Sequence, residues 1–315
     1  MKIAVLNECF LSDKNLVDLR ALGEVELYND TTDEATAIKR MTGKDIVLSD
    51  MYECPLNKNV LNQCKNLKFL CINSTGYDLV DLQAAAQNNI TVANTPGFST
   101  EAVAEHVFAL LLAVNRRILS GDQALRAKPF QINPADKAYY KYLGFNLAGK
   151  TMGIIGLGAI GSHVAKIAAG FGMQCIAYNR SEKHDTGVSM VSLEELFKQS
   201  DVITLHTPFN DDSKALINAG TLEKMNPHCI IINTARGGCV VSADLAAALA
   251  SGKIGGAGLD VLDSWTAENP LLHAPNTIVT PHSAWFTEEA LGKIGDIMTE
   301  NVKAFAAGKK MNVVS

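Results

Sequence analysis

The feature that most constrains the fold is a glycine-rich turn that joins an apolar run to an apolar helical stretch. Residues 150–161 read KTMGIIGLGAIG, and the helical segment SHVAKIAAGFG follows directly. Gly156, Gly158 and Gly161 have the G-x-G-x-x-G spacing, which allows a tight turn and a close approach of the backbone to a pyrophosphate. The first turn of the helix would add free N–H groups and the positive end of the helix dipole. The segment therefore predicts a strand, a turn that binds a dinucleotide, and a helix.

Short apolar runs alternate with amphipathic helical stretches on each side of this turn, which predicts parallel α/β sheets. The expected strands cover residues 2–7, 25–29, 45–50, 68–73 and 90–95 before the turn, and residues 174–179, 201–206, 229–235, 256–262 and 277–282 after it. Two further helices are expected at 99–125 and 287–308. A length of 315 residues suits about two domains. We therefore expect an α/β fold of two doubly wound parallel-sheet domains.

The composition argues against several classes of protein. With 47% hydrophobic and 19% charged residues, the chain suits a globular protein with a sizeable core. A net charge of −5 gives no electrostatic reason to expect a nucleic-acid partner. The longest apolar run, residues 107–114, is too short for a membrane span, which takes about 20 residues. Seven cysteines without a C-x-x-C pair favour reduced thiols in a cytoplasmic protein, and no cluster has metal-ligand spacing.

The residues after the expected strand at 174–179 bear on the choice of cofactor. They read YNRSEK (178–183), and Asn179 stands where such sites usually carry an acidic residue for the ribose 2′-hydroxyl. Asn179 would not repel a 2′-phosphate, and Arg180 and Ser181 could bind one through charge and a hydroxyl. Alternatively, Arg180 covers the adenine face and Asn179 binds the ribose hydroxyls. We favour NADP and keep NAD as the alternative.

Two residues that suit catalysis follow buried strands. Arg236 lies in NTARGG (233–238), and His282 lies in TPHSAW (280–285). Ligands of doubly wound sheets bind at the carboxyl ends of the strands, so both side chains should lie near a bound cofactor. Either residue alone has an ordinary interpretation, as a solvated arginine or a hydrogen-bonded histidine. Their common position at one edge of a nucleotide-binding sheet favours catalysis.

Seven ordered motifs give the chain a resemblance to the D-isomer-specific 2-hydroxyacid dehydrogenase family over nearly its whole length. They are NSTGYDLVDL (73–82), VANTPGFSTEAVAEHVFALLLAVNR (92–116), LAGKTMGIIGLGAIG (147–161), LHTP (205–208), INTARGG (232–238), GAGLDV (256–261) and NTIVTPHSAW (276–285). The resemblance implies a flavodoxin-like substrate domain, formed by residues 1–97 and 286–315. It also implies an inserted Rossmann dinucleotide-binding domain over 98–285, with an arm at about 98–145 that makes a homodimer.

The resemblance further implies an NAD(P)-dependent oxidoreductase that reduces a small 2-oxo acid, such as hydroxypyruvate or glyoxylate, to the D-2-hydroxy acid. Arg236 would bind the carboxylate and carbonyl oxygens of the substrate, and His282 would be the general acid. The loop of Ser74, Thr75 and Gly76 would bind the substrate carboxylate through backbone N–H groups. The residues implied for cofactor binding are Thr100, Gly156, Gly158, Ala159, Ile160, Gly161, Asn179, Arg180, His206, Thr207, Pro208, Thr234 and Asp260.

The chain departs from the family pattern beside the catalytic histidine. The family carries a glutamate five residues after the aspartate at Asp260, and here that position holds Trp265. Three interpretations stay open: Glu268 replaces the glutamate, Asp263 replaces it, or the histidine has no carboxylate partner. We favour Glu268, which would fix the tautomer of His282 and raise its pKa.

Other interpretations of single residues compete with these. Trp265 and Trp285 could shape a pocket for small 2-oxo acids, although tryptophan is as often a packing residue. His106, in an apolar helical run, is expected to pack in the core or between domains. It is not a candidate for catalysis.

Two other functions compete with a 2-oxo acid reductase. One is a dinucleotide-sensing binding protein of the corepressor type, which the missing glutamate favours. The other is a formate or phosphite dehydrogenase on the same scaffold. The presence of both Arg236 and His282 favours the reductase over the binding protein.

If Glu268 is the partner of His282, the substitution Glu268→Gln should lower the pKa of the histidine toward its ordinary value of about 6.5. The alkaline limb of the pH profile for 2-oxo acid reduction should then move to lower pH, because the histidine must be protonated to act as an acid. The measurement is the rate of reduction against pH for the variant and the wild type. An unmoved limb removes Glu268 from the mechanism.

Overall fold

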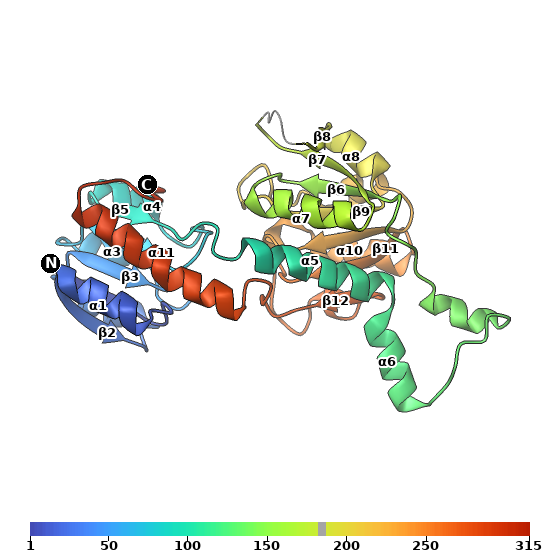
Figure 1. Cartoon of the computed structure of the whole chain (residues 1–315), viewed down its shortest axis with the longest axis horizontal. Helices are drawn as coiled ribbons and strands as arrows, with labels where there is room; N and C mark the ends of the chain where they lie inside the picture. Colours follow the sequence, from blue (N-terminus) through green and yellow to red (C-terminus); the bar gives the residue numbers. More distant parts are fainter. Residues whose placement is uncertain (182–186) are drawn as a thin grey trace. The chain divides into compact units, whose positions relative to one another are not determined.

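The structure, a computed structural model, describes residues 1–181 and 187–315. It divides into two compact units: unit 1 comprises Met1–Ser99 and Phe286–Ser315, and unit 2 comprises Thr100–Trp285. Each unit is a parallel sheet packed against helices, which confirms the predicted α/β fold of two parallel-sheet domains (Figure 1). Glu182 and Lys183, which belong to the run considered for cofactor choice, lie outside the described residues.

Unit 1 has five parallel strands in the order β2-β1-β3-β4-β5. They are β1 (Lys2–Leu6), β2 (Glu24–Tyr28), β3 (Ile46–Ser49), β4 (Phe69–Ile72) and β5 (Thr91–Ala93). A sheet in which the first strand lies between the second and the third is typical of flavodoxin-like folds. The flavodoxin-like expectation for this part of the chain is therefore confirmed.

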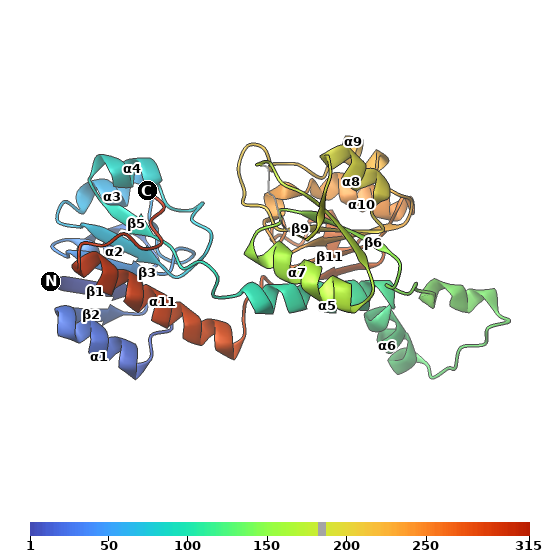
Figure 2. The ribbon, with the colours of Figure 1, turned by 45° about the horizontal axis from the view of Figure 1, so that its top comes forward.

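Helices cover both faces of this sheet (Figure 2). They are α1 (Asp13–Leu22), α2 (Glu34–Met41), α3 (Lys58–Gln63), α4 (Leu82–Gln87) and α11 (Glu288–Ala306). α2, α3 and α4 share one buried apolar cluster with the strands. α1 and α11 lie together on the other face, where Phe305 stacks on Phe69 with the ring centroids 4.5 Å apart. The C-terminal helix thus completes the core of unit 1.

Unit 2 has seven parallel strands in the order β12-β11-β10-β9-β6-β7-β8. They are β6 (Thr151–Ile155), β7 (Gln174–Tyr178), β8 (Ser189–Met190), β9 (Val202–Leu205), β10 (Cys229–Asn233), β11 (Ile254–Leu259) and β12 (Thr277–Val279). The order grows outward from β6 in both directions, as in a Rossmann fold. β8 was not among the expected strands, because two residues are too few to show a pattern.

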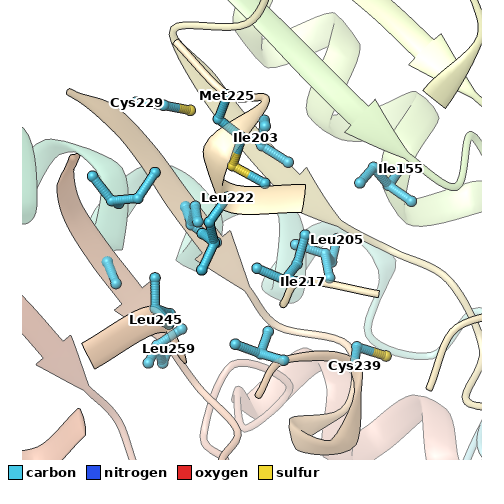
Figure 3. Packing of buried hydrophobic residues seen from close by; sticks show 14 of the residues in the cluster. Ile155, Ile203, Leu205, Ile217, Leu222, Met225, Cys229, Cys239, Leu245 and Leu259 are labelled. Atoms are coloured by element: carbon cyan, nitrogen blue, oxygen red, sulfur yellow. The ribbon is translucent and has the colours of Figure 1, made fainter. Parts of the chain in front are cut away.

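The two faces of the unit 2 sheet are buried under different helices. These are α5 (Thr100–Asn115), α7 (Ala159–Gly170), α8 (Leu193–Gln199), α9 (Ala219–Glu223) and α10 (Ser242–Ala250). Successive side chains of a strand point to opposite faces. Ile154 accordingly packs in the cluster under α5 and α7, and Ile155 packs in the cluster under α8, α9 and α10. Figure 3 shows the second cluster, which includes Leu205 and Leu222.

The prediction of one helix over 99–125 is wrong. α5 ends at Asn115, and α6 (Ile118–Ala127) starts after Arg117, whose φ of +52° is left-handed. The buried Asn115 side chain donates to the carbonyl oxygen of Phe145 at 2.8 Å and accepts its N–H at 3.1 Å. This pair of bonds fixes the end of α5. Within the predicted arm of about 98–145, α5 packs in the core of unit 2, and the name arm is used below for the part that follows it, residues 116–144. α6 buries none of its residues.

The described structure bears on three expectations from the sequence: the state of the cysteines, a membrane span and a metal site. All seven cysteines are free thiols, and burial raises the pKa of Cys71 to about 12. No helix within residues 1–181 and 187–315 is both long and apolar enough to cross a membrane. The same residues hold no group of three or more His, Cys, Asp or Glu side chains that could bind a metal ion.

Candidate active site

Three neighbouring strands bring the predicted catalytic residues to one edge of the unit 2 sheet. β10, β11 and β12 are adjacent and parallel. Arg236, Asp260 and His282 follow their carboxyl ends in this order. Neighbouring strands are about 4.8 Å apart, so these residues emerge in a row. The glycine turn after β6 is at the same edge, separated from β10 by β9 alone.

The glycine turn is closely packed at both ends and open in the middle. A Cβ on Gly156 would lie 2.6 Å from the carbonyl oxygen of His206, and one on Gly161 would lie 2.2 Å from the carbonyl oxygen of Gly156. Nothing lies within 4 Å of a Cβ on Gly158, which is the N-cap of α7 and makes no side-chain cap. The open side of Gly158, before the helix N-terminus, is where the motif would bind a pyrophosphate. Ala159 and Ile160 form the first turn of this helix.

The residues after β7 support the turn and introduce an unexpected charge. The amide oxygen of Asn179 accepts the N–H of Leu157 at 2.6 Å. The guanidinium of Arg180 is paired with the carboxylate of Asp212 at 2.7 Å, and both side chains are exposed. An exposed pair of this kind contributes about 0–1 kcal/mol. Asp212 would therefore compete with a cofactor 2′-phosphate for Arg180, but it binds this arginine only weakly.

His206, which follows β9, is not a general acid at physiological pH. Its Nε2 lies 2.9 Å from the hydroxyl of Thr204, and burial lowers the pKa of the imidazole to about 3. The ring is therefore neutral at physiological pH. Thr207 and Pro208 continue the loop, in which the carbonyl oxygen of Pro208 accepts the hydroxyl of Ser213 at 2.7 Å. These residues present neutral groups at this edge, and the acid role stays a prediction for His282.

The turn after β10 fixes the backbone of Arg236. The fully buried Asn233 side chain accepts the N–H of Ala235 at 3.0 Å and donates to the carbonyl oxygen of Arg236 at 2.9 Å. A Cβ on Gly237 would lie 1.9 Å from the carbonyl oxygen of Leu262, so glycine is required where this turn packs on the segment after β11. The Arg236 guanidinium donates to the carbonyl oxygen of Ala235 at 2.9 Å.

The hydroxyl of Thr234 is a buried polar atom with no hydrogen-bond partner among the described residues. Such atoms are rare in native proteins. Thr234 lies at the carboxyl end of β10, where the sequence predicts a cofactor contact. A bound dinucleotide would supply the missing partner, so the residues fit this group.

Asp260 holds the loop that carries His282. The residue is fully buried, and its side chain is 1% exposed. Oδ1 accepts the hydroxyl of Thr280 at 2.6 Å and the N–H of Ser283 at 2.9 Å, and Oδ2 accepts the N–H of Ala284 at 2.9 Å. The N–H of His282 donates to the carbonyl oxygen of Asp260 at 3.0 Å. Besides the cofactor contact that the sequence predicts, Asp260 therefore has a structural role within the chain.

The backbone of His282 is left-handed, with a φ of +56°. A non-glycine residue adopts this conformation at some cost and keeps it where its surroundings enforce it. Here the N–H of His282 also approaches the carbonyl oxygen of Thr280 at 2.9 Å. The bonds from its N–H to the carbonyl oxygens of Asp260 and Thr280 thus stabilise the left-handed backbone of the histidine.

Asp263, the second candidate partner of His282, is bonded elsewhere. Its Oδ1 accepts the hydroxyl of Ser242 at 2.5 Å and the side-chain N–H of Asn269 at 3.0 Å. Because Ser242 begins α10, Asp263 ties the loop after β11 to that helix. These bonds give Asp263 a structural role. They do not test whether Asp263 is also the partner of His282.

Glu268, the favoured partner, is exposed on the same loop. Hydrogen bonds from its own N–H and from the hydroxyl of Thr266 lower the pKa of its carboxyl group. Trp265, which stands at the position of the family's glutamate, is 56% exposed. The partnership of Glu268 with His282 stays a prediction for the Glu268→Gln profile to test.

In unit 1, the predicted substrate loop follows β4 at the carboxyl edge of its sheet. The hydroxyl of Thr75 donates to the carbonyl oxygen of Thr95 at 3.0 Å, and the side chain of Asn94 donates to the carbonyl oxygen of Thr75 at 2.7 Å. The N–H of Thr95 donates to the carbonyl oxygen of Ser74 at 3.0 Å. The loop of Ser74, Thr75 and Gly76 is therefore anchored to the end of β5.

Sequence reasoning missed two residues near this site. Asp212 was not considered, because nothing in the sequence pairs it with Arg180. His106 was expected to be a packing residue, but its Nε2 lies 3.0 Å from the hydroxyl of Thr280 and 3.7 Å from Oδ1 of Asp260. A histidine inside an otherwise apolar helical run was the available signal.

Comparison with known proteins agrees with this geometry. The sequence profile described as "D-isomer specific 2-hydroxyacid dehydrogenase, NAD binding domain" matches residues 108–284. The chain is 37% identical to the hydroxypyruvate reductase of Blautia hydrogenotrophica over 100% of both chains. The chain belongs to this dehydrogenase family. The enzyme is therefore an oxidoreductase that uses a nicotinamide dinucleotide.

Two further relatives indicate the range of activities near this enzyme. It is 39% identical to the glycerate dehydrogenase of Methylorubrum extorquens over 92% of both chains. A solved structure described as an acyclic imino acid reductase (Bsp5) in complex with NADPH and D-Arg is 35% identical, with a TM-score of 0.93 over 100% of both chains. These names lend no support to the corepressor or the formate and phosphite alternatives.

The Asp260→Asn variant tests the role of the buried carboxylate. Asparagine keeps one acceptor oxygen and turns an N–H₂ group toward a donor, so the loop that carries His282 should shift. We expect the kcat of the variant to fall about 10–100-fold and its midpoint of thermal unfolding to drop. Steady-state kinetics and a melting curve measure both, with Asp211→Asn, which changes an exposed aspartate of the same unit, as the control. A rise in the KM for the cofactor at unchanged kcat would contradict the loop-holding role.

Proposed function

We propose that the enzyme reduces a small 2-oxo acid, such as hydroxypyruvate or glyoxylate, to the D-2-hydroxy acid. The observation that carries this proposal is the row of Arg236, Asp260 and His282 at the edge of a Rossmann sheet. An arginine and a histidine at that edge suit the binding and protonation of a 2-oxo acid. The names of the two curated relatives support the same substrate class.

Each residue has a defined task in this reaction. When bound, the dinucleotide supplies the hydride. The guanidinium of Arg236 binds the substrate carboxylate and carbonyl oxygen, which lowers the energy of the negative charge that develops there. His282 then gives its proton to that oxygen. The loop of Ser74, Thr75 and Gly76 adds backbone donors for the carboxylate.

The turnover test uses purified enzyme with NADPH or NADH and, in turn, hydroxypyruvate, glyoxylate, pyruvate and a bulkier 2-oxo acid. We expect loss of the reduced-nicotinamide absorbance with at least one small acid, and a D-configured product. The Arg236→Gln variant should lose most of this activity, because a neutral amide replaces the charged guanidinium that binds the substrate. Tight cofactor binding without turnover on any of these acids would refute the proposal.

For the cofactor, we infer a preference for NADP over NAD. Asn179 carries no charge to repel a 2′-phosphate, and the exposed Arg180 can exchange its surface pair with Asp212 for a phosphate. The similar imino acid reductase was solved with NADPH, which supports the same preference.

Substitutions at this surface pair test the preference. Arg180→Gln should lower the ratio of kcat/KM for NADPH over NADH by about tenfold, and Asp212→Asn should raise it, because Arg180 loses a competitor. The neighbouring exposed carboxylate gives the control variant Asp211→Asn. A ratio that does not change in Arg180→Gln would remove this arginine from 2′-phosphate recognition.

We also infer that the arm joins two copies of the chain. No residue of its helix α6 is buried within the chain, and apolar side chains along the arm are exposed. The most exposed are Ile118, Ile132, Tyr140 and Leu143. A cavity of about 450 Å³ with three tyrosines and Leu143 in its wall adds apolar surface. Sedimentation at equilibrium should give the mass of a dimer, and a monomer would contradict the inference.

A second candidate is reduction of a 2-imino acid to a D-amino acid. The observation that favours it is the high similarity to the acyclic imino acid reductase over the whole chain. A protonated imine already carries the proton that a carbonyl oxygen must receive, so this reaction places less demand on His282. Turnover of pyruvate that requires added ammonia or methylamine and yields an amino acid would favour this candidate. Equal rates with and without amine would favour 2-oxo acid reduction.

A further inference from the structure

We propose that His106 is a positioning residue for His282 and that it acts through the hydroxyl of Thr280 and the carboxylate of Asp260. The proposal rests on the proposed role of His282 as the general acid. All four residues belong to unit 2, and they come from the helix α5, the end of β11 and the loop after β12. The sequence alone gave His106 no task at the site.

The direction of each hydrogen bond follows from the buried carboxylate. An ionised Asp260 can only accept, so the Thr280 hydroxyl, 2.6 Å from Oδ1, must donate to it. The Thr280 oxygen then has lone pairs left for the Nε2 of His106, 3.0 Å away. His106 must therefore carry a proton on Nε2 and donate it to Thr280. The result is a chain of donors that runs from His106 through Thr280 to Asp260.

This chain limits the rotation of the Thr280 hydroxyl. With the His106 Nε2–H on one side and Oδ1 of Asp260 on the other, the hydroxyl has one orientation that satisfies both neighbours. Without His106, the hydroxyl could leave Asp260 for other acceptors. Of its donors among the described residues, Oδ1 would then keep the N–H of Ser283 at 2.9 Å. Hydrogen bonds in series also strengthen one another.

The backbone around the catalytic histidine is sensitive to this support. His282 has a φ of +56°, and its N–H is bonded to the carbonyl oxygens of Asp260 and Thr280. If Thr280 is less firmly fixed, the bond from the His282 N–H to its carbonyl oxygen weakens, and the left-handed backbone of His282 loses one of its two supports. Since α5 is a 16-residue helix packed on the sheet, His106 links the loop to one of the larger rigid elements of unit 2.

A direct charge effect is the alternative way for His106 to act. Its Nε2 lies 3.7 Å from Oδ1 of Asp260, which is within reach of an ion pair. The hydrogen-bond chain does not need that charge, because a neutral imidazole with Nε2 protonated donates equally. A glutamine side chain can place an N–H₂ group near the same point without any charge. This difference allows an experiment to separate geometry from charge.

The experiment compares His106→Leu with His106→Gln and uses Glu105→Gln, an exposed neighbour on α5, as the control. We expect His106→Leu to lower kcat about tenfold with a small change in KM, and His106→Gln to keep most of the wild-type kcat. Thr280→Val breaks the same chain from its other end. The double variant His106→Leu/Thr280→Val should be no worse than Thr280→Val alone, because both remove one coupled unit.

A second readout does not depend on turnover. The ¹³C-labelled Cε1 resonance of His282, assigned from its absence in His282→Gln, should shift in His106→Leu and stay near the wild-type position in His106→Gln. An inactive wild type would refute the proposed function, while these spectra would still test the positioning role. Equal defects in His106→Leu and His106→Gln, or no effect of His106→Leu on either readout, would overturn the proposal.

Discussion

The geometry of the candidate active site depends on how one buried carboxylate is satisfied. A charge such as that of Asp260, taken fully out of water, costs several kcal/mol unless it is hydrogen-bonded. Bonds to a charged group contribute about 1.5–3 kcal/mol each, so three donors can offset this cost. All three come from residues 280–284, the segment that contains His282. The requirement to satisfy the carboxylate and the requirement to fix the histidine are therefore met by the same bonds.

The other parts of the site are held by similarly short-range means. Asn233 closes the turn before Arg236, and the missing side chain at Gly237 lets this turn pack on Leu262, two residues after Asp260. The turns after β10 and β11 therefore share one packed contact. Neutral His206 completes the edge without competing for protons. His206 therefore does not supply the acid at this edge, which is the role proposed for His282.

The sequence predicts those parts of the structure that depend on local patterns. The glycine spacing, the strand positions and the placement of Arg236 and His282 after strands need only residues close to one another in the chain. The break after Asn115 depends on bonds to a residue 30 positions away, which a helical pattern cannot reveal. Likewise, Arg180 meets Asp212 across 32 positions, and His106 meets Thr280 across 174. The role of Glu268 was not predictable for a related reason, since Trp265 stands where the family carries its glutamate and the local pattern does not say which carboxylate replaces it.

The two bonds between Asn115 and Phe145 have a consequence beyond the shape of α5. They join the two ends of the arm, so the chain leaves the core of unit 2 and returns to it at nearly the same point. The entropic cost of closing a loop grows only slowly with its length. The segment between Asn115 and Phe145 can therefore lengthen, shorten or change sequence with little effect on the Rossmann core. The arm is in this sense a module. Selection on the proposed pairing of two copies through the arm can act on it separately from selection on the chemistry at the strand ends.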